Sequence, residues 1–144
     1  MAHLNSISVD DRLAITEVIH KFYWLVDHGR AGETAGLFTK TARLTFGPGA
    51  PKPGTIQGPH IPAAMAARAK QVEVTTRHVL SNIRLIPNAD GSVSACSLLT
   101  LFRSDTAARD SYPASIADID EVFVRGDGGW YIQERTILPI FFHP

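Results

Sequence analysis

Residues 74–86 read VTTRHVLSNIRLI, and they place polar side chains inside what is otherwise a β-strand pattern. The segment is rich in β-branched residues, contains neither glycine nor proline, and ends before Pro87 and a turn at about residues 88–91, which is typical of a strand. Because neither face of this strand is wholly apolar, we expect the sheet to cover a core or cavity that contains polar groups. His78 is the first candidate for chemistry, and the alternative is a hydrogen-bonded core histidine. The face that alternation predicts for it comprises Val74, Thr76, His78, Leu80, Asn82 and Arg84.

The apolar pattern from Ser8 to about Asp27 has the period of an α-helix. Ser8 followed by Asp11 resembles a capping box, and His28-Gly29 is typical of a helix end. One continuous arc of the helix is apolar and is expected to face the core. Its residues are Ile15, Val18, Ile19, Phe22, Leu25 and Val26.

A polar stripe lies beside that apolar arc on the same helix. Its members, at spacings of 4, 3 and 4 residues, are Thr16, His20, Tyr23 and Asp27. These spacings place the four side chains within about 60° of one another, and Trp24 borders them. Burying such a stripe is unfavourable unless its members are hydrogen-bonded or line a cavity. For Asp27 the alternative is a carboxylate in solvent at the helix end.

The rest of the chain predicts two more helices and a series of strands. A short helix at about residues 31–38 and an alanine-rich helix at about 61–71, with Pro62 in its first turn, complete a set of three. The proline- and glycine-rich segment at about 47–59 is the kind of loop that often covers a pocket mouth. The expected strands span about 41–46, 55–57, 74–86, 92–104, 116–125 and 130–141, with a longer loop at about 105–115.

Helices first and strands afterwards indicate the α+β class. We expect one domain over residues 1–144, a cone-shaped α+β barrel in which three N-terminal helices pack on a strongly bent antiparallel or mixed sheet of about five or six strands. Glu121 and Arg135 are expected to form a cross-strand ion pair that sets register. Arg68 is expected to lie in solvent, and the alternative is that it faces a cavity. Residues 137–142 (ILPIFF) are more apolar than a free terminus requires, which favours a homo-oligomer, a dimer or a trimer, built on the outer sheet face and this tail.

Composition limits the partners. Lys plus Arg and Asp plus Glu number 14 each, with an isoelectric point near 7.0, so we expect no binding to nucleic acid or to a membrane, and a small neutral or apolar ligand suits this balance better. No apolar run approaches the roughly 18 residues of a membrane span, and residues 1–6 (MAHLNS) lack the regions of a signal peptide. Cys96 has no second cysteine and no clustered ligands, so we predict no metal site and an inert, buried thiol. A soluble, cytoplasmic protein is expected.

Four segments of the chain are similar to segments of a known protein family. They are YWLVD at 23–27, LF at 37–38 followed by TA at 41–42, RHVLSN at 77–82, and GWYI at 129–132 followed by ER at 134–135. In these segments the chain resembles the SnoaL-like family of the nuclear transport factor 2-like superfamily, and the resemblance covers essentially its whole length. It implies the cone-shaped α+β fold already expected from the order of the elements.

The resemblance also implies a site. Asp27 and His78 match in position the Asp and His that scytalone dehydratase and hexachlorocyclohexane dehydrochlorinase use as a dyad, in which the His removes a proton from carbon and the Asp orients and charges it. Tyr23 is similar to a tyrosine one helical turn before the Asp in some dehydratases. From their positions on the helix stripe and the strand face, His20, Trp24 and Asn82 are also expected to line the pocket and contact the substrate; for Asn82 the alternative is a hydrogen bond to the backbone of a neighbouring strand. Such a step requires no metal and no organic cofactor.

Three functions remain open. The leading hypothesis is a cofactor-independent lyase that removes a proton from carbon and expels water or another small group from a small, largely apolar or aromatic, polyketide-like molecule. An isomerase or polyketide cyclase would use the same base. A non-enzymatic ligand-binding or assembly module is the alternative from another class, because one fold serves many functions. A contact between Asp27 and His78 in a pocket favours an enzyme, whereas an open cone with a protein-sized groove favours the module.

Overall fold

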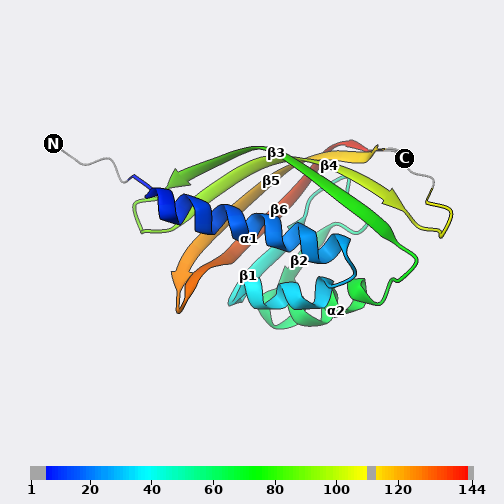
Figure 1. Ribbon diagram of the computed structural model, residues 1–144, viewed down its shortest axis with the longest axis horizontal. Helices are drawn as coiled ribbons and strands as arrows, with labels where there is room; N and C mark the ends of the chain where they lie inside the picture. The colour runs from blue at the N-terminus through cyan, green and yellow to red at the C-terminus, as the bar shows by residue number, and fades with distance from the viewer. Residues whose placement is uncertain (1–5, 110–112, 143–144) are drawn as a thin grey trace.

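Helices pack against one face of a single curved sheet in the computed structural model, which describes residues 6–109 and 113–142 (Figure 1). Residues 1–5, which entered the signal-peptide prediction, and residues 110–112, in the middle of the predicted 105–115 loop, lie outside the described residues. The helical elements are α1 (Val9–Asp27), η1 (Ala31–Leu37), η2 (Gly58–His60) and α2 (Ile61–Ala69), where η denotes a 3-10 helix. The strands are β1 (Phe38–Phe46), β2 (Gly54–Gln57), β3 (Thr75–Pro87), β4 (Val93–Ser104), β5 (Pro113–Gly126) and β6 (Gly129–Phe142).

The strands form one six-stranded sheet in the order β2-β1-β6-β5-β4-β3. Neighbouring strands are antiparallel except β1 and β6, which are parallel. The α+β class, the three main helical segments and the bent mixed sheet are therefore confirmed. The barrel is not closed, because β2 and β3 are the two edges of the sheet.

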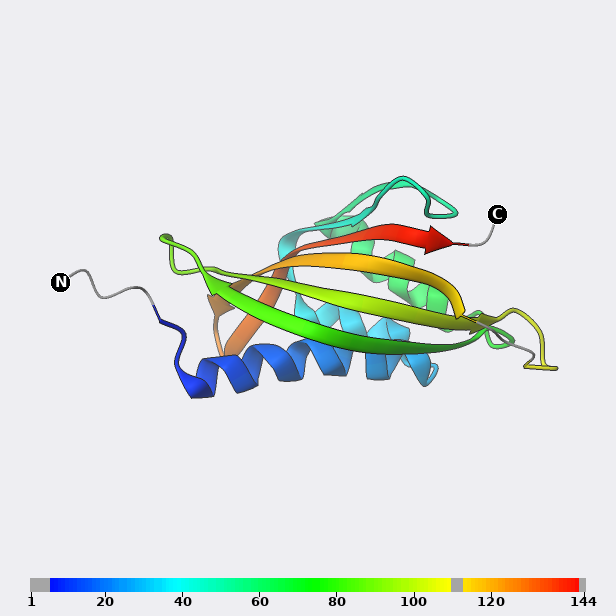
Figure 2. The same cartoon turned by 90° about the horizontal axis from the view of Figure 1, so that it is seen from above.

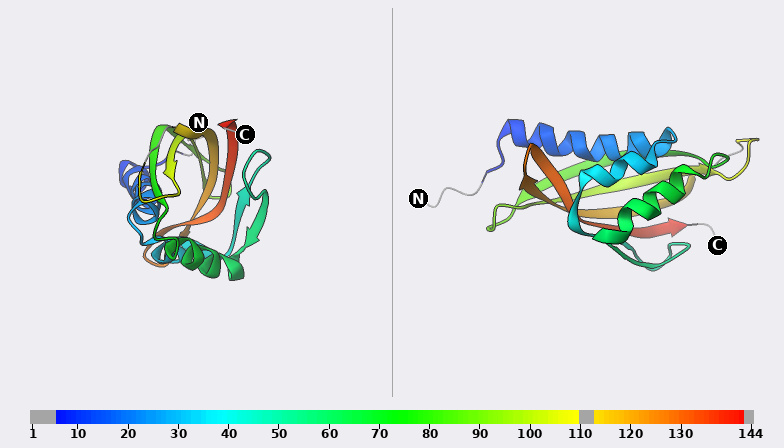
Figure 3. Two further views of the ribbon diagram at one scale, coloured as in Figure 1. Left: turned by 90° about the vertical axis from the view of Figure 1, so that its right-hand side faces the viewer. Right: turned by 90° about the horizontal axis from the view of Figure 1, so that it is seen from below.

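The sheet curls around the helices. Figure 2 shows α1 lying along one side of the long, bent strands, and the end-on view in Figure 3 shows the sheet curving into a trough whose open side is covered by α1 and α2. η1 packs on both α1 and α2, whereas among the strands α1 meets mainly the edge strand β3. We call the line where residues 12–28 face residues 76–85 the α1–β3 seam.

Both ends of α1 are held by specific contacts. Ser8 caps the helix, and its side chain accepts a hydrogen bond from the backbone N–H of Asp11 at 3.0 Å. The Asp11 carboxylate also accepts hydrogen bonds from Arg125 at 2.6 Å and from Trp130 at 3.0 Å, which ties α1 to the β5–β6 hairpin. At the other end Gly29 adopts a φ of 75°, a conformation that glycine allows at little steric cost and that ends the helix.

Side chains fill the space between α1 and the sheet. The core residues of α1 are Ile15, Ile19, Phe22, Tyr23, Leu25 and Val26. The strands contribute Leu44, Leu99, Ile119, Phe123 and Ile132, among others, to the same cluster. Burying each large apolar side chain contributes about 1.5–3 kcal/mol, so this cluster is the main source of stability.

The convex face of the sheet and the C-terminal tail expose large apolar side chains. They include Leu98, Ile116, Ile140, Phe141 and Phe142. The ring of Phe142 lies against Gly49, so the loop at 47–59 lies beside the end of β6. Homo-oligomerisation through this face stays a prediction.

Two local predictions are corrected. β1 begins at Phe38 rather than near residue 41, because the preceding segment forms the 3-10 helix η1 and ends sooner than the predicted α-helix. Gly32 and Gly36 lie within this segment and lower its helix propensity. Cys96, which we expected to be buried, is only partly buried.

A β-bulge interrupts β3 at Asn82. Ser81 pairs with Leu98, but the next pair joins Arg84 to Cys96, so two residues of β3 face one residue of β4. Asn82 itself has a φ of 56°, a left-handed conformation that asparagine tolerates better than most residues.

This bulge reverses the alternation of β3. His78 and Leu80 are partly buried before it, and Ile83 and Leu85 are partly buried after it, whereas Asn82 is exposed. The predicted face that carried His78 and Asn82 together is therefore wrong beyond Leu80. The extra residue of the bulge shifts the side-chain period by one position.

We predict that Gly58→Ala destabilises the fold. An added Cβ at Gly58 would overlap the backbone carbonyl of Lys40 and lie 3.1 Å from the backbone nitrogen of Ala42, and neither group moves without distorting β1. The expected loss of unfolding free energy is about 1–3 kcal/mol or more, measured by chemical denaturation. Gly36→Ala is the matched control, because nothing lies within 4 Å of its added Cβ, and it should change the stability by less than about 0.5 kcal/mol. Equal stability of the two variants would contradict this packing.

Candidate active site

Asp27 and His78 are in direct contact across the α1–β3 seam. Asp27 is the last residue of α1, and its Oδ1 lies 2.5 Å from Nδ1 of His78. Its Oδ2 accepts a hydrogen bond from the backbone N–H of His78 at 2.8 Å. The exposed fractions of the side chains are 6% for Asp27 and 15% for His78. The structure thus brings together, largely away from solvent, the two residues singled out in the sequence.

The contact defines the state of the imidazole ring. A carboxylate can only accept hydrogen bonds, so the hydrogen between the two groups is assigned to Nδ1 of His78. In the neutral form of the ring, Nε2 then carries the lone pair and is the ring nitrogen that does not contact Asp27. Asp27 therefore selects the tautomer that a general base requires.

Three further residues hold Asp27 at the C-terminal end of α1. The hydroxyl of Thr76 donates to Oδ1 at 2.7 Å, and Arg68 donates to that hydroxyl at 3.1 Å. Arg77 donates to the backbone carbonyl of Asp27 at 2.8 Å. Arg68 is partly buried, so the prediction that it lies in solvent is wrong.

These contacts determine the acidity of Asp27. Burial alone would raise the pKa of the carboxyl, but the hydrogen bonds from His78, its positive charge when protonated and the bond from Thr76 outweigh burial and hold the pKa below its ordinary value. Asp27 is therefore a carboxylate at neutral pH.

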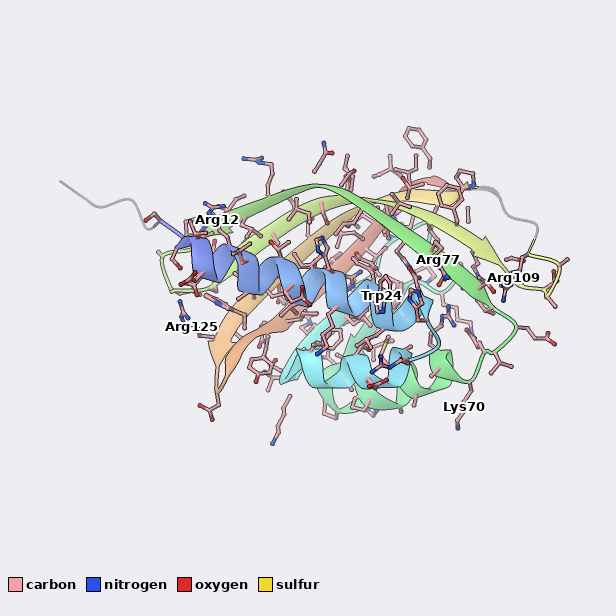
Figure 4. The ribbon with its side chains drawn as sticks, viewed as in Figure 1. Arg12, Trp24, Lys70, Arg77, Arg109 and Arg125 are labelled. Carbon is pink, nitrogen blue, oxygen red and sulfur yellow. The ribbon has the colours of Figure 1, made fainter. Side chains whose placement is uncertain are left out.

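A cavity of about 500 Å³ opens beside this pair. Its lining residues are His20, Tyr23, Trp24, Asp27, His28, Arg77, His78 and Leu80. Figure 4 shows Trp24 on α1 and Arg77 on β3 at this part of the seam. The polar stripe predicted from the helix wheel thus faces a cavity through His20, Tyr23 and Asp27, with Trp24 beside them.

Asn82 and the loop at 47–59 do not line this cavity. Asn82 is exposed at the bulge, so its side chain is separated from His78 by the reversal of the strand face. In the part of the chain that the structure describes, no group of three or more His, Cys, Asp or Glu side chains is arranged to hold a metal ion.

Tyr23 connects the cavity to a buried charge network. Its ring centroid lies 5.1 Å from that of His78, and its side chain is almost fully buried. Nη2 of Arg135 donates to the phenol oxygen at 2.5 Å. Burial raises the pKa of Tyr23, and the charge of Arg135 opposes this effect. The phenol therefore stays protonated at neutral pH.

Arg135 and Glu121 form the predicted cross-strand pair. Nη1 of Arg135 lies 2.9 Å from Oε2 of Glu121, and the two residues are direct partners on β6 and β5. Both side chains are buried, and the guanidinium lies 4.3 Å and 4.7 Å from the ring centroids of Phe22 and Tyr23. The pair was expected only to set the register of the two strands. Its arginine also binds the phenol oxygen of Tyr23, a contact that the sequence did not reveal.

His28 was seen in the sequence only as a helix end. Its ring stacks on Trp24 with centroids 4.0 Å apart. Its Nδ1 lies 2.7 Å from the backbone carbonyl of Trp24, so Nδ1 carries the hydrogen there. The spacing of four residues was the available signal, since side chains at i and i+4 meet on a helix. Arg77 and Leu80 were also missed as lining residues, although both lie close to His78 in the strand.

The sequence and the fold place the chain among known proteins. A curved mixed sheet with helices on its concave side is the nuclear transport factor 2-like, or cystatin-like, fold, and solved structures share it. The chain belongs to the SnoaL-like domain family, whose model matches residues 8–136. A search of curated protein sequences gives no significant match.

Three solved structures illustrate the similarity. Aln2 from a Streptomyces species is 19% identical with a TM-score of 0.74, over 92% of this chain and 93% of its own. A nuclear transport factor 2-like protein from Novosphingobium aromaticivorans is 19% identical with a TM-score of 0.75, over 92% and 83%. A second protein from Novosphingobium aromaticivorans, provisionally named a scytalone dehydratase, is 17% identical with a TM-score of 0.74, over 95% and 93%. At these identities the likeness shows the fold alone.

Among the residues described, none of the helices combines the length and apolar character needed to cross a membrane.

We predict that Arg135→Met destabilises the protein by about 3–5 kcal/mol, because it leaves Glu121 as a buried carboxyl without its cation. Adding Glu121→Leu should restore most of that loss, since an apolar pair of similar volume leaves no buried charge that needs a partner. Chemical denaturation of the single and double variants measures both effects. A double variant no more stable than Arg135→Met would contradict this assignment.

We predict that Asp27 contributes to acid sensitivity. Because its folded pKa lies below the unfolded value, near 3.9, the folded state binds fewer protons between the two values. Its contribution to stability is thus present above about pH 4 and is lost as the pH falls through the folded pKa. Unfolding free energies measured from neutral to strongly acidic pH should fall less for Asp27→Asn than for the wild type. Asp11 and Asp90 also have lowered pKa values. Both residues are present in the wild type and in Asp27→Asn, so their effects cancel when the two curves are compared. Parallel curves would contradict the prediction.

Proposed function

We propose that this protein is a cofactor-independent lyase of the dehydratase type, acting on a small, largely apolar or aromatic, polyketide-like molecule. The observation that carries the proposal is the contact of 2.5 Å between Asp27 and His78 at the wall of a cavity of about 500 Å³. A histidine held in this way by a carboxylate is a typical general base. The membership of the SnoaL-like family and the provisional name of the scytalone dehydratase-like neighbour support the same class of reaction.

The base acts through Nε2 of His78. Nε2 takes a proton from a carbon next to a carbonyl group, and Asp27 stabilises the imidazolium that forms. The electron pair of the broken C–H bond becomes the new double bond, while the bond to a β-hydroxyl group breaks. That hydroxyl takes a proton from an acid in the cavity and leaves as water. Each turnover thus removes one water molecule; His78 then releases its proton to solvent, and the acid regains a proton from solvent, so both groups return to their starting states.

Tyr23 and His20 are the candidate acids. Tyr23 accepts a hydrogen bond from Arg135, so its own O–H can donate to the substrate carbonyl or to the leaving oxygen. His20 lines the same cavity one helical turn before Trp24. If the substrate lacks a leaving group, the same base supports isomerisation or ring closure. A ligand-binding module without chemistry is the alternative that the next experiment separates.

The test measures the first chemical step directly. The protein is incubated in D2O with a panel of hydroxylated tetralones and 1,3-diketones, and NMR follows the exchange of hydrogen at the carbon next to the carbonyl. We expect exchange with the wild type and, for β-hydroxy compounds, loss of one water by mass spectrometry. His78→Ala and Asp27→Asn should each lower the rate by about 10²–10⁴-fold, because the first removes the base and the second no longer stabilises its charge.

His60→Gln is the matched control, because His60 is an exposed histidine outside the cavity, and it should leave the rate unchanged. Exchange that persists in His78→Ala would contradict the assigned base. Panel members that change the tryptophan fluorescence of the protein without exchange or water loss would instead identify a ligand-binding module.

A further inference from the structure

Arg77 brings a positive charge to the rim of the cavity that contains Asp27 and His78. It lines this cavity, although alternation along β3 directs its side chain to the opposite face from Thr76 and His78. Because β3 is an edge strand, a long side chain can bend around it. The hydrogen bond of 2.8 Å from Nη1 to the backbone carbonyl of Asp27 shows that the guanidinium reaches the end of α1.

One nitrogen of the guanidinium holds the group in place. Nη1 donates to the carbonyl of Asp27 and, at 2.7 Å, to the carbonyl of Thr76. These two bonds use both hydrogens of Nη1. A cation at the C-terminal end of a helix also interacts favourably with the helix dipole, so this part of Arg77 acts as a cap of α1. Capping leaves the three hydrogens of Nε and Nη2 unused.

The edge formed by Nε and Nη2 of Arg77 is the one that binds carboxylates. In Arg30 the same two nitrogens donate to both carboxylate oxygens of Glu33, and such paired donation is strong and specific. Beyond its two backbone contacts, Arg77 forms no hydrogen bond and no ion pair with any residue that the structure describes. It therefore presents a carboxylate-binding edge that is fixed in position and unoccupied by the protein's own acids.

The charges around Asp27 favour a further anion. Asp27 is the one acid among the residues that line the cavity. Its two carboxylate oxygens already accept hydrogen bonds from Thr76 and from the ring and backbone of His78. Arg68 lies behind Thr76, to which it donates, so two guanidinium groups surround a single carboxylate. A second negative charge from a bound molecule is therefore attracted to the free edge of Arg77.

A pair of stacked rings forms another part of the cavity wall. Trp24 and His28 both line the cavity, with ring centroids 4.0 Å apart and an interplanar angle of 20°. The exposed fraction of Trp24 is 63%, which leaves much apolar area uncovered. Trp24 belongs to α1 and Arg77 to β3, the two elements on either side of this cavity (Figure 4). A flat ring bound against Trp24 covers that area.

We propose that the cavity binds a planar aromatic carboxylic acid, whose ring lies against Trp24 and whose carboxylate accepts hydrogen bonds from Nε and Nη2 of Arg77. The inference rests on the proposed function and names the substrate class of the same site, with Arg77 as the specificity-determining residue. Arg77 contacts the carbonyl of Asp27, and His78 contacts its carboxylate. The acid group and the reacting carbon therefore belong to one compact molecule rather than to the two ends of a long one.

The first experiment compares an acid with a neutral molecule of nearly the same shape. Isothermal titration calorimetry measures the binding of 2-naphthoate and of 2-naphthamide to the full chain. We expect the acid to bind about tenfold more tightly, because paired hydrogen bonds to a carboxylate are charge-assisted. Arg77→Gln should lower the affinity for the acid to that for the amide and leave the amide unchanged. Arg77→Lys should keep a smaller preference of about threefold, because it retains the charge but not the fork.

The matched control is Arg84→Gln, which removes an exposed arginine of the same strand that does not line this cavity. It should leave both affinities unchanged. Equal binding of acid and amide by the wild type, or an equal loss of acid binding in Arg84→Gln, would overturn the proposal. Loss of both acid and amide binding in Arg77→Gln would also overturn it, because that result would identify Arg77 only as the cap that holds the end of α1.

A second experiment tests the position of the ring. Trp24→Ala should weaken the binding of acid and amide by the same factor, because it removes the aromatic surface and leaves the charge of Arg77. Unchanged affinities in Trp24→Ala would place the probes elsewhere and contradict the proposed site.

These binding measurements involve no reaction, so they are separate from the test of the proposed function. An acid preference that depends on Arg77, found together with hydrogen exchange that persists in His78→Ala, would remove the proposed function and leave the carboxylate site. Exchange that depends on His78, found without an acid preference, would leave the proposed function and remove this inference.

Discussion

The carboxylate of Asp27 is the group on which the α1–β3 seam depends. It lies at the C-terminal end of α1, where the helix dipole disfavours a negative charge. Hydrogen bonds from Thr76, from the backbone N–H of His78 and from its ring offset that penalty. The same three bonds dock the end of the helix on an edge strand and hold the histidine in one tautomer, so one set of contacts positions both the fold and the candidate base.

A buried layer of charge lies behind this seam. Arg135 bridges Glu121 and Tyr23, and Tyr23 packs on His78. Buried ions require partners, and Arg135 finds them in the carboxylate of Glu121 and the phenol oxygen of Tyr23. The interior of the cone is otherwise filled by apolar side chains. The cavity beside Asp27 and His78 therefore lies at the α1–β3 seam.

Much of the site could be anticipated because it depends on local periodicity. The spacing of His20, Tyr23 and Asp27 on one helix face follows from 3.6 residues per turn, and a stripe of this kind beside an apolar arc indicates a cavity. The order of three helical segments and a meander likewise determined the α+β class. The family resemblance added the pairing of Asp27 with His78, which no periodicity within one element can supply.

The chain by itself determined which side chains share a helix face, where α1 begins and ends, and that Glu121 and Arg135 stand opposite each other. Only the tertiary structure decided which elements meet. The bulge at Asn82 depends on how β3 registers with β4, and it moved Asn82 out of the site and turned Ile83 inward. The positions of Arg68, Arg77 and Arg135 around the dyad likewise depend on contacts between segments far apart in the sequence. Such contacts are set by the packing of the whole domain, because local patterns specify the face of an element but not its neighbour.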